Sequence, residues 1–314
     1  MQTGETPGTK AIGTPASPAK AVPWAVKRRR TFIYFLAPAM ILLFIVTILP
    51  TIYLIATSFT PLDLTKPKSL YFSGLTNYQQ LLKDDRFWNS LWVQARLSFW
   101  TVTLQMLLGL GLAVLLNARL KFLEFLRSAF ILPMVLPPVV VALTWKILFT
   151  PNVSILNYTL GLLHLPQPAW LADGNLALWA IIIADVWEWF PFVLLMLLAG
   201  LQMMPEEPLE AARIDGASGL QIFRHITLPL LRPVLLVAAL FRLIDSIKAF
   251  PHIYIMTGGG PGVATEATNY YSYLEAFSYT YIGFSSAIIT VMLAVAFGLS
   301  VGVIRAVGQE VEVE

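Results

Sequence analysis

The chain has 314 residues, of which 57% are hydrophobic and only 12% are charged, and its formal net charge is +3. Soluble domains carry about 25% charged residues, so this composition, together with apolar runs long enough to cross a bilayer, indicates an integral membrane protein. The small net charge is no sign of nucleic-acid binding, and the absence of cysteine excludes a disulfide framework, a cysteine metal site and a cysteine nucleophile.

The chain begins with a segment rich in Pro, Ala, Gly and Thr that has no apolar periodicity. We expect residues 1–26 to be disordered and assign residues 1–30 to a basic cytoplasmic tail, because the basic run at 27–30 directly precedes the first apolar segment. That segment is longer than the core of a signal peptide. It therefore predicts a retained span whose basic end lies in the cytoplasm.

Six apolar segments are each long enough to cross a bilayer as a helix. Prolines inside them are tolerated where neighbouring helices or water satisfy the freed carbonyls, and the pair Pro137-Pro138 predicts a break or bend in the third. The fold prediction is an all-α polytopic membrane protein with a transmembrane domain over 31–306 and a C-terminal cytoplasmic tail over 307–314. The predicted spans are 32–58, 91–117, 128–149, 176–203, 230–251 and 282–306.

Two predicted outer segments have a character of their own. Residues 59–90 predict a small amphipathic cap on the outer surface, and residues 151–175 predict a loop in which Trp170 serves as a membrane-interface anchor.

The distribution of Lys and Arg predicts the orientation of the spans. Short cytoplasmic loops of membrane proteins carry an excess of basic residues, which favours both termini in the cytoplasm here. The segments assigned to the cytoplasm hold Arg28, Arg29, Arg30, Arg119, Lys121, Arg127, Arg213, Arg224, Arg232 and Arg305, whereas the opposite side holds only Lys66, Lys68, Lys83 and Arg86.

A short polar insert at 205–229 separates the fourth and fifth predicted spans. The acidic, proline-flanked run at 205–208 is a helix-start pattern. Gly216 predicts the end of that helix, and Ser218 with Gln221 predicts a capping box that begins a second one. The pattern indicates a rigid helix–turn–helix, which on the residues alone is either an amphipathic linker at the membrane surface or a docking surface for a protein in the aqueous phase.

This insert resembles the coupling loop of the permease subunits of binding-protein-dependent ABC importers. The residues that carry the resemblance are Glu210-Ala-Ala, Asp215-Gly216-Ala217, Phe223, Ile226 and Leu228-Pro229. Two further motifs are similar to the carbohydrate-uptake branch, in permeases such as those for maltose, trehalose and glycerol phosphate: Thr257-Gly-Gly-Gly-Pro261 and Gly74-Leu75-x-Asn77-Tyr78. The resemblance covers residues 30–306 and favours the docking interpretation.

The resemblance implies a permease subunit that forms half of a pathway for a sugar or sugar derivative in the bacterial cytoplasmic (inner) membrane. It implies a second, homologous permease subunit as heterodimer partner, two copies of an ABC ATPase subunit, and a periplasmic or lipoprotein solute-binding protein. We expect no nucleic-acid partner, no catalytic residue and no cofactor in this chain. It lacks the Walker A pattern and so cannot bind ATP by that route, and ATP and Mg would bind to the ATPase subunits. The residues expected to contact the ATPase are Glu210, Ala211, Ala212, Asp215, Gly216, Ala217 and Phe223.

Charged residues also lie within the predicted spans, where each costs about 2.5–3.5 kcal/mol at the bilayer centre on insertion scales. Arg242 and Asp245 lie three positions apart and can pair on one helix face. A sugar site needs polar groups for hydroxyls and aromatic faces for C–H patches. The candidates for the solute pathway are Trp187, Glu188, Phe192, Asp245 and Lys248. The alternative is that these charges brace helix against helix or hold the partner permease.

Several questions stay open at the level of the sequence. The glycines at 258–260 are either a flexible turn or a contact to the binding protein or pathway. The histidines show no metal-ligand spacing and are treated as surface or packing residues: His164, His225 and His252. The identity of the sugar and the make-up of the permease pair are open. The alternative functions are a permease of an ABC importer for a non-sugar solute and a stand-alone secondary transporter.

Overall fold

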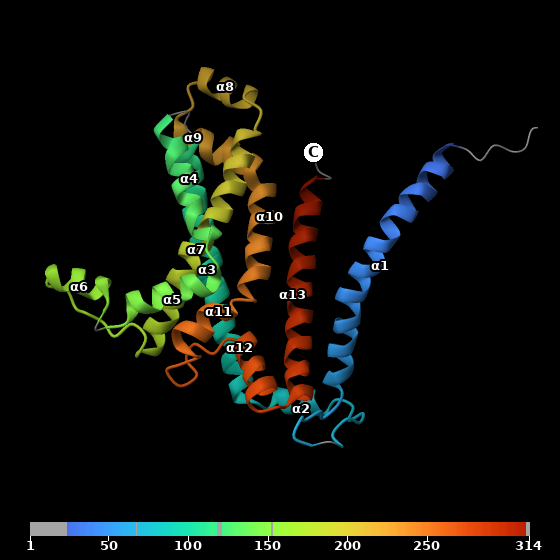
Figure 1. Ribbon diagram of the computed structural model, residues 1–314. Coiled ribbons are helices and arrows are strands. Elements are labelled where there is room, and N and C mark those ends of the chain that lie inside the picture. The colour runs from blue at the N-terminus through green and yellow to red at the C-terminus, as the bar shows by residue number, and fades with distance from the viewer. Residues whose placement is uncertain (1–23, 67, 118–120, 152, 312–314) are drawn as a thin grey trace, which may run out of the picture. The chain divides into compact units, whose positions relative to one another are not determined.

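The computed structural model describes residues 24–66, 68–117, 121–151 and 153–311, and the regular structure of these residues is helical throughout (Figure 1). The chain divides into two compact units, Met1–Tyr53 and Leu54–Glu314, which are described separately. The all-α fold predicted from the sequence is confirmed.

The first unit holds most of helix α1, Trp24–Ser58, which contains Pro38 and Pro50. The helix begins before the basic run at 27–30, and the rest of the predicted tail lies outside the described residues. From Thr31 onward the side chains of this unit are mostly apolar and nearly all exposed. A helix that is apolar on every side is typical of a membrane span.

The second unit is arranged around helix α7, Gly174–Gln202. Of the candidate membrane spans, α7 has the largest share of buried residues. Helices α3 (Asp85–Leu116) and α10 (Leu228–Ser246) pack against it, and its leucine, isoleucine and alanine side chains contribute to both large apolar clusters of the unit. The last long helix is α13, Ile282–Val311. Among the described residues, five helices are each long and apolar enough to cross a membrane: α1, α3, α7, α13 and the helix that contains α10.

A bent pair of helices accounts for the third predicted span. Helices α4 (Lys121–Val135) and α5 (Pro138–Phe149) meet at an angle of 99°, so the predicted break at Pro137-Pro138 is confirmed. Pro137 is extended and Pro138 opens α5, since neither proline has an N–H to continue the first helix. If the bent pair counts as one span, the described residues hold six candidate spans, as predicted.

The boundaries of the fifth span differ from the prediction at both ends. It ends at Ser246 rather than at 251, because the ring of Pro251 clashes with a helical carbonyl four positions earlier, and a new short helix, α11, begins at Phe250. It begins at Gly219 rather than at 230: α9 (Gly219–Ile222), the π-turn η1 (Phe223–Thr227) and α10 form one continuous helix. The wider π-turn allows Pro229 to sit inside the helix without ending it.

Short helical elements connect the long helices. Between α10 and α13 the chain passes through α11 (Phe250–His252), η2 (Ile253–Thr257), α12 (Thr268–Tyr273) and η3 (Leu274–Ser278). Helix α6, Ile155–Leu162, lies in the segment predicted as a loop, and there the Trp170 indole donates to Asn157 at 2.9 Å. Helix α2, Thr76–Leu82, lies in the predicted cap, where the Asn77 amide donates to the Ser58 and Thr60 carbonyls.

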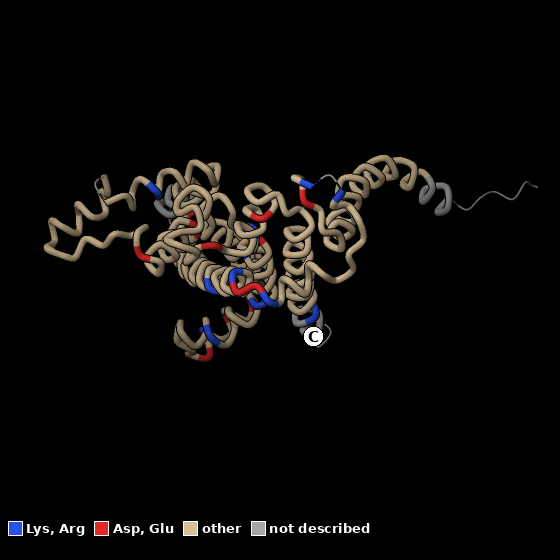
Figure 2. Tube along the Cα trace, turned by 90° about the horizontal axis from the view of Figure 1, so that it is seen from below, with Lys and Arg blue, Asp and Glu red and all other residues tan. Residues whose placement is uncertain are grey.

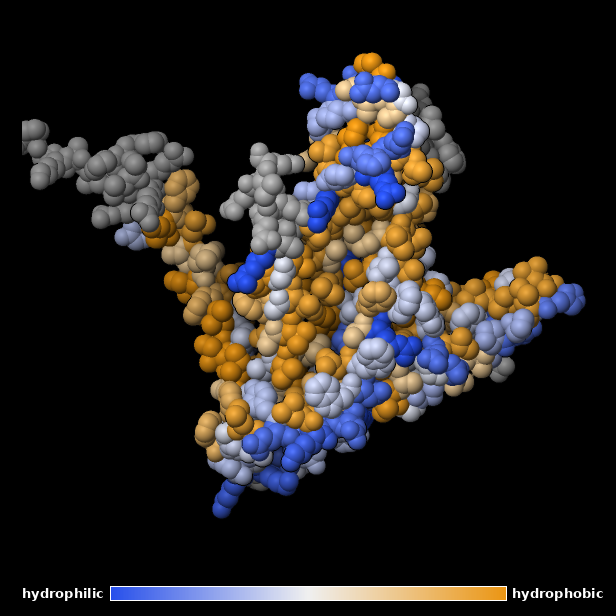
Figure 3. All heavy atoms as spheres, turned by 180° about the vertical axis from the view of Figure 1, so that it is seen from behind, coloured by the Kyte–Doolittle hydropathy of each residue, from blue (hydrophilic) through white to orange (hydrophobic). Residues whose placement is uncertain are grey.

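The two ends of the second unit are polar, and the band between them is apolar. Helices α8 (Glu207–Ile214) and α9 lie at the same end as the end of α13, and α2 lies at the opposite end (Figure 1). Figure 3 shows hydrophilic residues gathered at these ends on the face in view, with hydrophobic residues between them. Figure 2, seen from below, shows that Lys, Arg, Asp and Glu are few among the described residues.

Candidate functional site: a docking end and a buried polar network

Helix α8 and its exit follow the predicted pattern closely. The helix has Pro208 in its first turn, ends at Ile214 with Asp215 as its C-cap, and is followed by Gly216 with φ +77°. The chain reverses there because the Gly216 amide donates to Arg213 O at 3.1 Å and the Ala217 amide donates to Ala212 O at 2.9 Å. Glycine adopts this left-handed conformation without the penalty that a side chain brings, so the angle of the turn depends on it.

The predicted capping box at the start of α9 is confirmed. The Ser218 amide donates to Gln221 Oε1 at 2.7 Å, and the Gln221 amide donates to Ser218 Oγ at 3.4 Å. The second helix of the insert therefore has a side-chain cap at its start, and the first begins with Pro208 in its first turn, so the insert is a helix–turn–helix as predicted.

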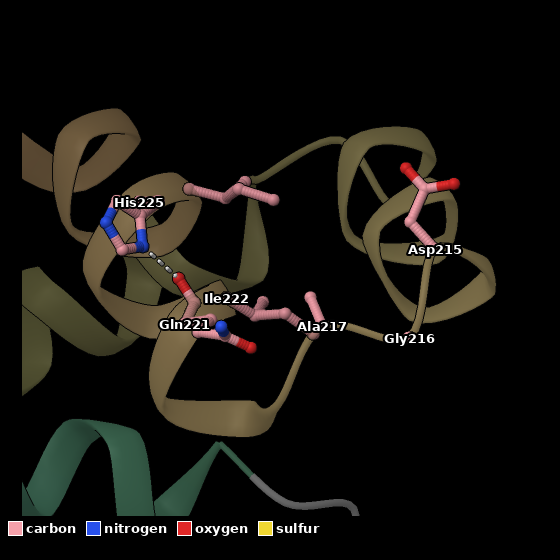
Figure 4. A pocket seen from close by; sticks show the side chains of 7 residues that line it. Asp215, Gly216, Ala217, Gln221, Ile222 and His225 are labelled. Atoms are coloured by element: carbon pink, nitrogen blue, oxygen red, sulfur yellow. Dashed lines mark hydrogen bonds between the residues drawn. The ribbon is translucent and has the colours of Figure 1, made fainter.

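A hollow of about 360 Å³ lies between α8 and the start of the continuous helix from Gly219 to Ser246, called the long helix below. Figure 4 shows Ala217 and Ile222 at its wall and the His225 ring turned to Gln221, whose carbonyl lies 3.0 Å from His225 Nδ1. Asp215 stands at the end of α8 across from them (Figure 4). The hollow is open to the surface and small enough for a few side chains of another protein.

The predicted docking residues divide into an outer and an inner set. Most of them are exposed or half-buried around the turn: Glu210, Ala211, Ala212, Asp215, Gly216 and Ala217. Phe223 instead lines a second hollow of about 280 Å³, under α8, together with Met204 and Leu209. Phe223 is thus placed to support the loop from beneath.

Two apolar side chains at this end were missed by the sequence reasoning. Ile214 is 86% exposed and Leu220 is 76% exposed, although both lie among charged residues at the polar end of the unit. An apolar residue inside an otherwise polar insert was the available signal. This exposure leaves both side chains available for contact with another protein.

A buried polar network joins α3, α7 and α10 within the apolar band. Arg242 is 2% exposed and donates to Asp245 Oδ2 at 2.7 Å and to Gln105 Oε1 at 2.8 Å. Gln105 in turn donates to Asp185 Oδ2 at 2.8 Å, and the Arg242 guanidinium lies 3.7 Å from that same oxygen. The ring of Trp189 lies 4.8 Å from the guanidinium carbon. The predicted pairing of Arg242 with Asp245 is confirmed, and Arg242 is also held by two further helices.

The five pathway candidates differ in their contacts and in their exposure. Trp187 meets Trp145 of α5 edge to face at 5.8 Å, and Phe192 meets Phe241 of α10 at 6.2 Å. The Asp245 side chain is 43% exposed, and Lys248 is exposed. Glu188 is fully buried, and its Oε2 lies 3.0 Å from Nε2 of His252, which is also buried. The burial of His252 fits a packing residue, but its pairing with Glu188 was not predicted.

The loop after η2 is held in place by hydrogen bonds, unlike the flexible turn expected as one option. The hydroxyls of Thr257 and Thr265 lie 2.7 Å apart, and Thr265 also donates to Gly260 O at 2.7 Å. Gly259 has φ +83° and packs so closely on the Tyr270 ring that a Cβ would lie 2.8 Å from it. This end of the molecule is therefore ordered by its own contacts.

An ion pair and a buried carboxyl group add to this order. Arg86 donates to both carboxylate oxygens of Glu266, at 2.7 and 2.8 Å. Burial raises the pKa of the nearby Glu275, whereas hydrogen bonds from Thr65 lower the pKa of Asp63 in the segment after α1. Within the described residues no three His, Asp or Glu side chains lie close enough to hold a metal ion.

Comparisons with known proteins agree with this architecture. Residues 105–312 match the family model of the binding-protein-dependent transport system inner membrane component. The trehalose/maltose transport system permease protein MalF of Thermococcus litoralis is 42% identical over 231 residues, which cover 72% of this chain and 77% of that protein. The sulfoquinovosyl glycerol transport system permease protein SmoG of Agrobacterium fabrum is 35% identical over 264 residues, covering 84% and 86%.

A solved structure shares the fold. A chain in the crystal structure of a bacterial ABC transporter for import of the acidic polysaccharide alginate superimposes with a TM-score of 0.78. The two chains are 19% identical, and the match covers 91% of this chain and 97% of that one.

Proposed function

This chain belongs to the family of binding-protein-dependent transport system inner membrane components, and we propose that it forms half of a membrane pathway for uptake of a sugar or sugar derivative. The observation that carries the proposal is the exposed, capped helix–turn–helix at 205–229, which stands at one polar end of an apolar bundle. The names of the relatives favour a sugar as solute, since permeases for trehalose, maltose and sulfoquinovosyl glycerol are among them.

The partners follow from this role. A second permease subunit would complete the pathway, two ATPase subunits would each receive one docking loop, and an extracytoplasmic binding protein would deliver the solute. The docking loop and both termini would then face the cytoplasm. ATP and Mg would bind to the ATPase subunits.

The docking surface has a defined chemistry. Ile214 and Leu220 project from it as apolar anchors, and the acidic side chains of Glu207, Glu210 and Asp215 outnumber the single basic one of Arg213 on and beside α8. Interfaces draw most of their binding energy from a few well-packed anchors. The complementary ATPase surface is expected to be apolar at its centre and basic around it.

Movement of this surface has a direct route into the membrane. The helix from Gly219 to Ser246 has 28 residues, which at a rise of about 1.5 Å per residue is about 42 Å. It begins at the docking turn and carries Arg242 and Asp245 near its other end. A displacement of the docking loop would therefore reach the buried polar network through one continuous helix.

The pathway residues follow from exposure and position. Phe192, Asp245 and Lys248 are at least partly exposed on or just beyond α7 and α10 and would face solute or the partner permease. Trp187 packs against Trp145 of α5. Only the exposed part of its ring would then be available to contact solute. Glu188 is fully buried and would reach solute only after a rearrangement.

Reconstitution tests this function. The chain is assembled in proteoliposomes with its neighbouring permease, ATPase and binding-protein subunits, and ATP hydrolysis is measured with maltose, trehalose or sulfoquinovosyl glycerol as the probe. We expect one of these sugars to stimulate hydrolysis and to be taken up. Failure of the chain to assemble with an ATPase would contradict the proposal. If only a non-sugar solute stimulates ATP hydrolysis, the transporter belongs to a different substrate class.

A further inference from the structure

Glu188 of α7 and His252 of α11 form a buried pair whose polar atoms are poorly satisfied. Their side chains are 0% and 3% exposed, and Oε2 and Nε2 lie 3.0 Å apart. The approach is not aligned as a hydrogen bond, so both carboxylate oxygens and Nε2 lack a hydrogen-bond partner in the described part of the chain. Val186, two positions before Glu188, and Ile253, directly after His252, belong to one apolar cluster.

The pair is in ion-pair contact at 3.0 Å, but this contact is weaker than a fully hydrogen-bonded one. A buried polar group without a hydrogen bond costs about 1–3 kcal/mol. The Arg242 network shows that this protein satisfies buried charges elsewhere, with direct bonds at 2.7 and 2.8 Å. Ionisable residues within membrane segments are most often kept for function. The Glu188–His252 pair is therefore better suited to an element that changes state than to a permanent contact.

The pair lies directly beyond the end of the long helix. The helix from Gly219 ends at Ser246, three residues lie outside regular helix, and α11 begins at Phe250. After His252 the chain enters the π-turn η2, and such turns are frequent at functional sites. A shift of the long helix along its axis would thus be transmitted across a short break to His252.

Few other polar groups restrain α11 from the elements that pack on it. Lys146 of α5 donates to Ile255 O at 2.8 Å, one turn beyond His252. On α7, Asp185 is already engaged by Gln105 and lies near Arg242. Within the part of the chain that the structure describes, the polar contact between α7 and α11 is the one between Glu188 and His252.

We propose that Glu188 and His252 are a latch of the transport cycle. In the closed state, which is the arrangement described here, the latch holds α11 against α7. It opens when the long helix moves. Each of the two side chains then gains hydrogen bonds that it lacks in the closed state. His252 is in this sense a positioning residue, because it keeps Glu188 away from the solute pathway until the latch opens. The inference rests on the proposed function, since it assigns a step of the transport cycle to this pair.

Three variants test the latch in the reconstituted complex. In Glu188→Leu/His252→Leu an apolar pair replaces the polar one inside an apolar cluster, a change that is often neutral or stabilising. We expect this double variant to assemble and to keep the thermal stability of the complex. Solute-stimulated ATP hydrolysis and uptake should fall at least tenfold, because two leucines gain nothing when the contact opens.

The other variants separate a latch from a static contact. His252→Gln keeps an N–H donor near the position of Nε2 and should retain stimulated hydrolysis within threefold of the wild type. His252→Leu alone leaves the Glu188 carboxyl group buried without a partner. It should raise ATP hydrolysis in the absence of solute at least threefold, because the closed state is weakened.

The outcomes are distinguishable. A double variant with wild-type uptake would show that the pair is a dispensable contact, and a double variant that does not assemble would show that it is a required brace; either result overturns the latch. Loss of activity in His252→Gln equal to that of the double variant would also overturn it. If the wild-type complex shows no solute-stimulated hydrolysis, the proposed function fails and not the latch alone.

Discussion

The two ends of the helix from Gly219 to Ser246 differ in how their charges are satisfied. Beside its start, the carboxylates of Glu210 and Asp215 are exposed and have no hydrogen bond or ion pair to other described residues. Near its end, Arg242 is buried and has partners from two other helices as well as from its own. At the buried end, the partners of Arg242 all come from this chain. At the exposed end, another protein would supply partners for the carboxylates.

The largest effect is expected from changes at the docking turn. Gly216→Pro is incompatible with φ +77°, since proline fixes φ near about −65°, and it removes the amide that donates to Arg213 O. Glu210→Lys reverses the charge at this position and removes the net negative charge of the docking surface. Each variant should insert normally but lose more than tenfold of solute-stimulated ATP hydrolysis and uptake.

Gly219→Ala is the matched control for the docking turn. Gly219 has no unusual φ, and a Cβ there would meet nothing within 4 Å. It should therefore keep wild-type activity. Full coupling in both Gly216→Pro and Glu210→Lys would mean that the exposed end is not a docking surface.

A second large effect is expected at the buried end, on stability. Arg242→Leu leaves the Asp185 carboxylate buried without its cation, which costs about 3–5 kcal/mol when one partner of a buried pair is removed. Asp245→Asn should be mild, because Arg242 keeps Gln105 and Asp185 and the Asp245 side chain is 43% exposed. Thermal unfolding of the assembled complex checks both expectations.

The Asp245 variant also decides between the two roles left open for this residue. Reduced transport with unchanged stability in Asp245→Asn would support a contact with solute. Loss of assembly in Asp245→Asn that Arg242→Gln rescues would make it a structural partner of Arg242, and the network would then depend on it more than its exposure indicates.

A smaller effect is expected from the apolar anchors of the exposed end. Ile214→Ala or Leu220→Ala should weaken binding of the ATPase by about 1–2 kcal/mol, because each removes apolar surface that is buried only in the complex. Phe297→Ala is the control, since Phe297 is 70% exposed on α13, away from the docking loop. Equal affinity for all three variants would remove Ile214 and Leu220 from the interface.

The smallest effect concerns Glu275. Burial raises its pKa, so its charged form is disfavoured in the folded protein, and this destabilisation grows as the pH rises through the folded-state pKa. Glu275→Gln should therefore raise the melting temperature by a few degrees at most at pH 8, and the gain should shrink toward pH 5. A gain that is larger at pH 5 would contradict this sign.

Local features of the fold could be predicted from the sequence, and long-range ones could not. The capping box at Ser218, the turn at Gly216 and the break at Pro137-Pro138 depend on neighbouring residues, so their patterns are visible in the chain itself. The continuity of the helix through Pro229 was missed because it depends on a π-turn, which has no clear sequence pattern.

The polar contacts within the bundle show the same limit. Arg86 and Glu266 lie 180 positions apart, and their pairing depends on how α3 packs beside the loop after η2. The pairing of Glu188 with His252 likewise requires the approach of α7 and α11, which periodicity does not report. Arg242 with Asp245 was predicted because both lie on one turn of the same helix.

The most direct test of the account is the side of the membrane on which each polar end lies. The chain has no cysteine, so single cysteines at Ser218 in the docking loop and at Gln80 of α2 can be labelled with an impermeant maleimide on whole cells. The account predicts that Gln80→Cys is labelled from outside and that Ser218→Cys is labelled only after the cells are made permeable. Labelling of Ser218→Cys from outside would place the docking loop away from ATP and contradict the proposed function.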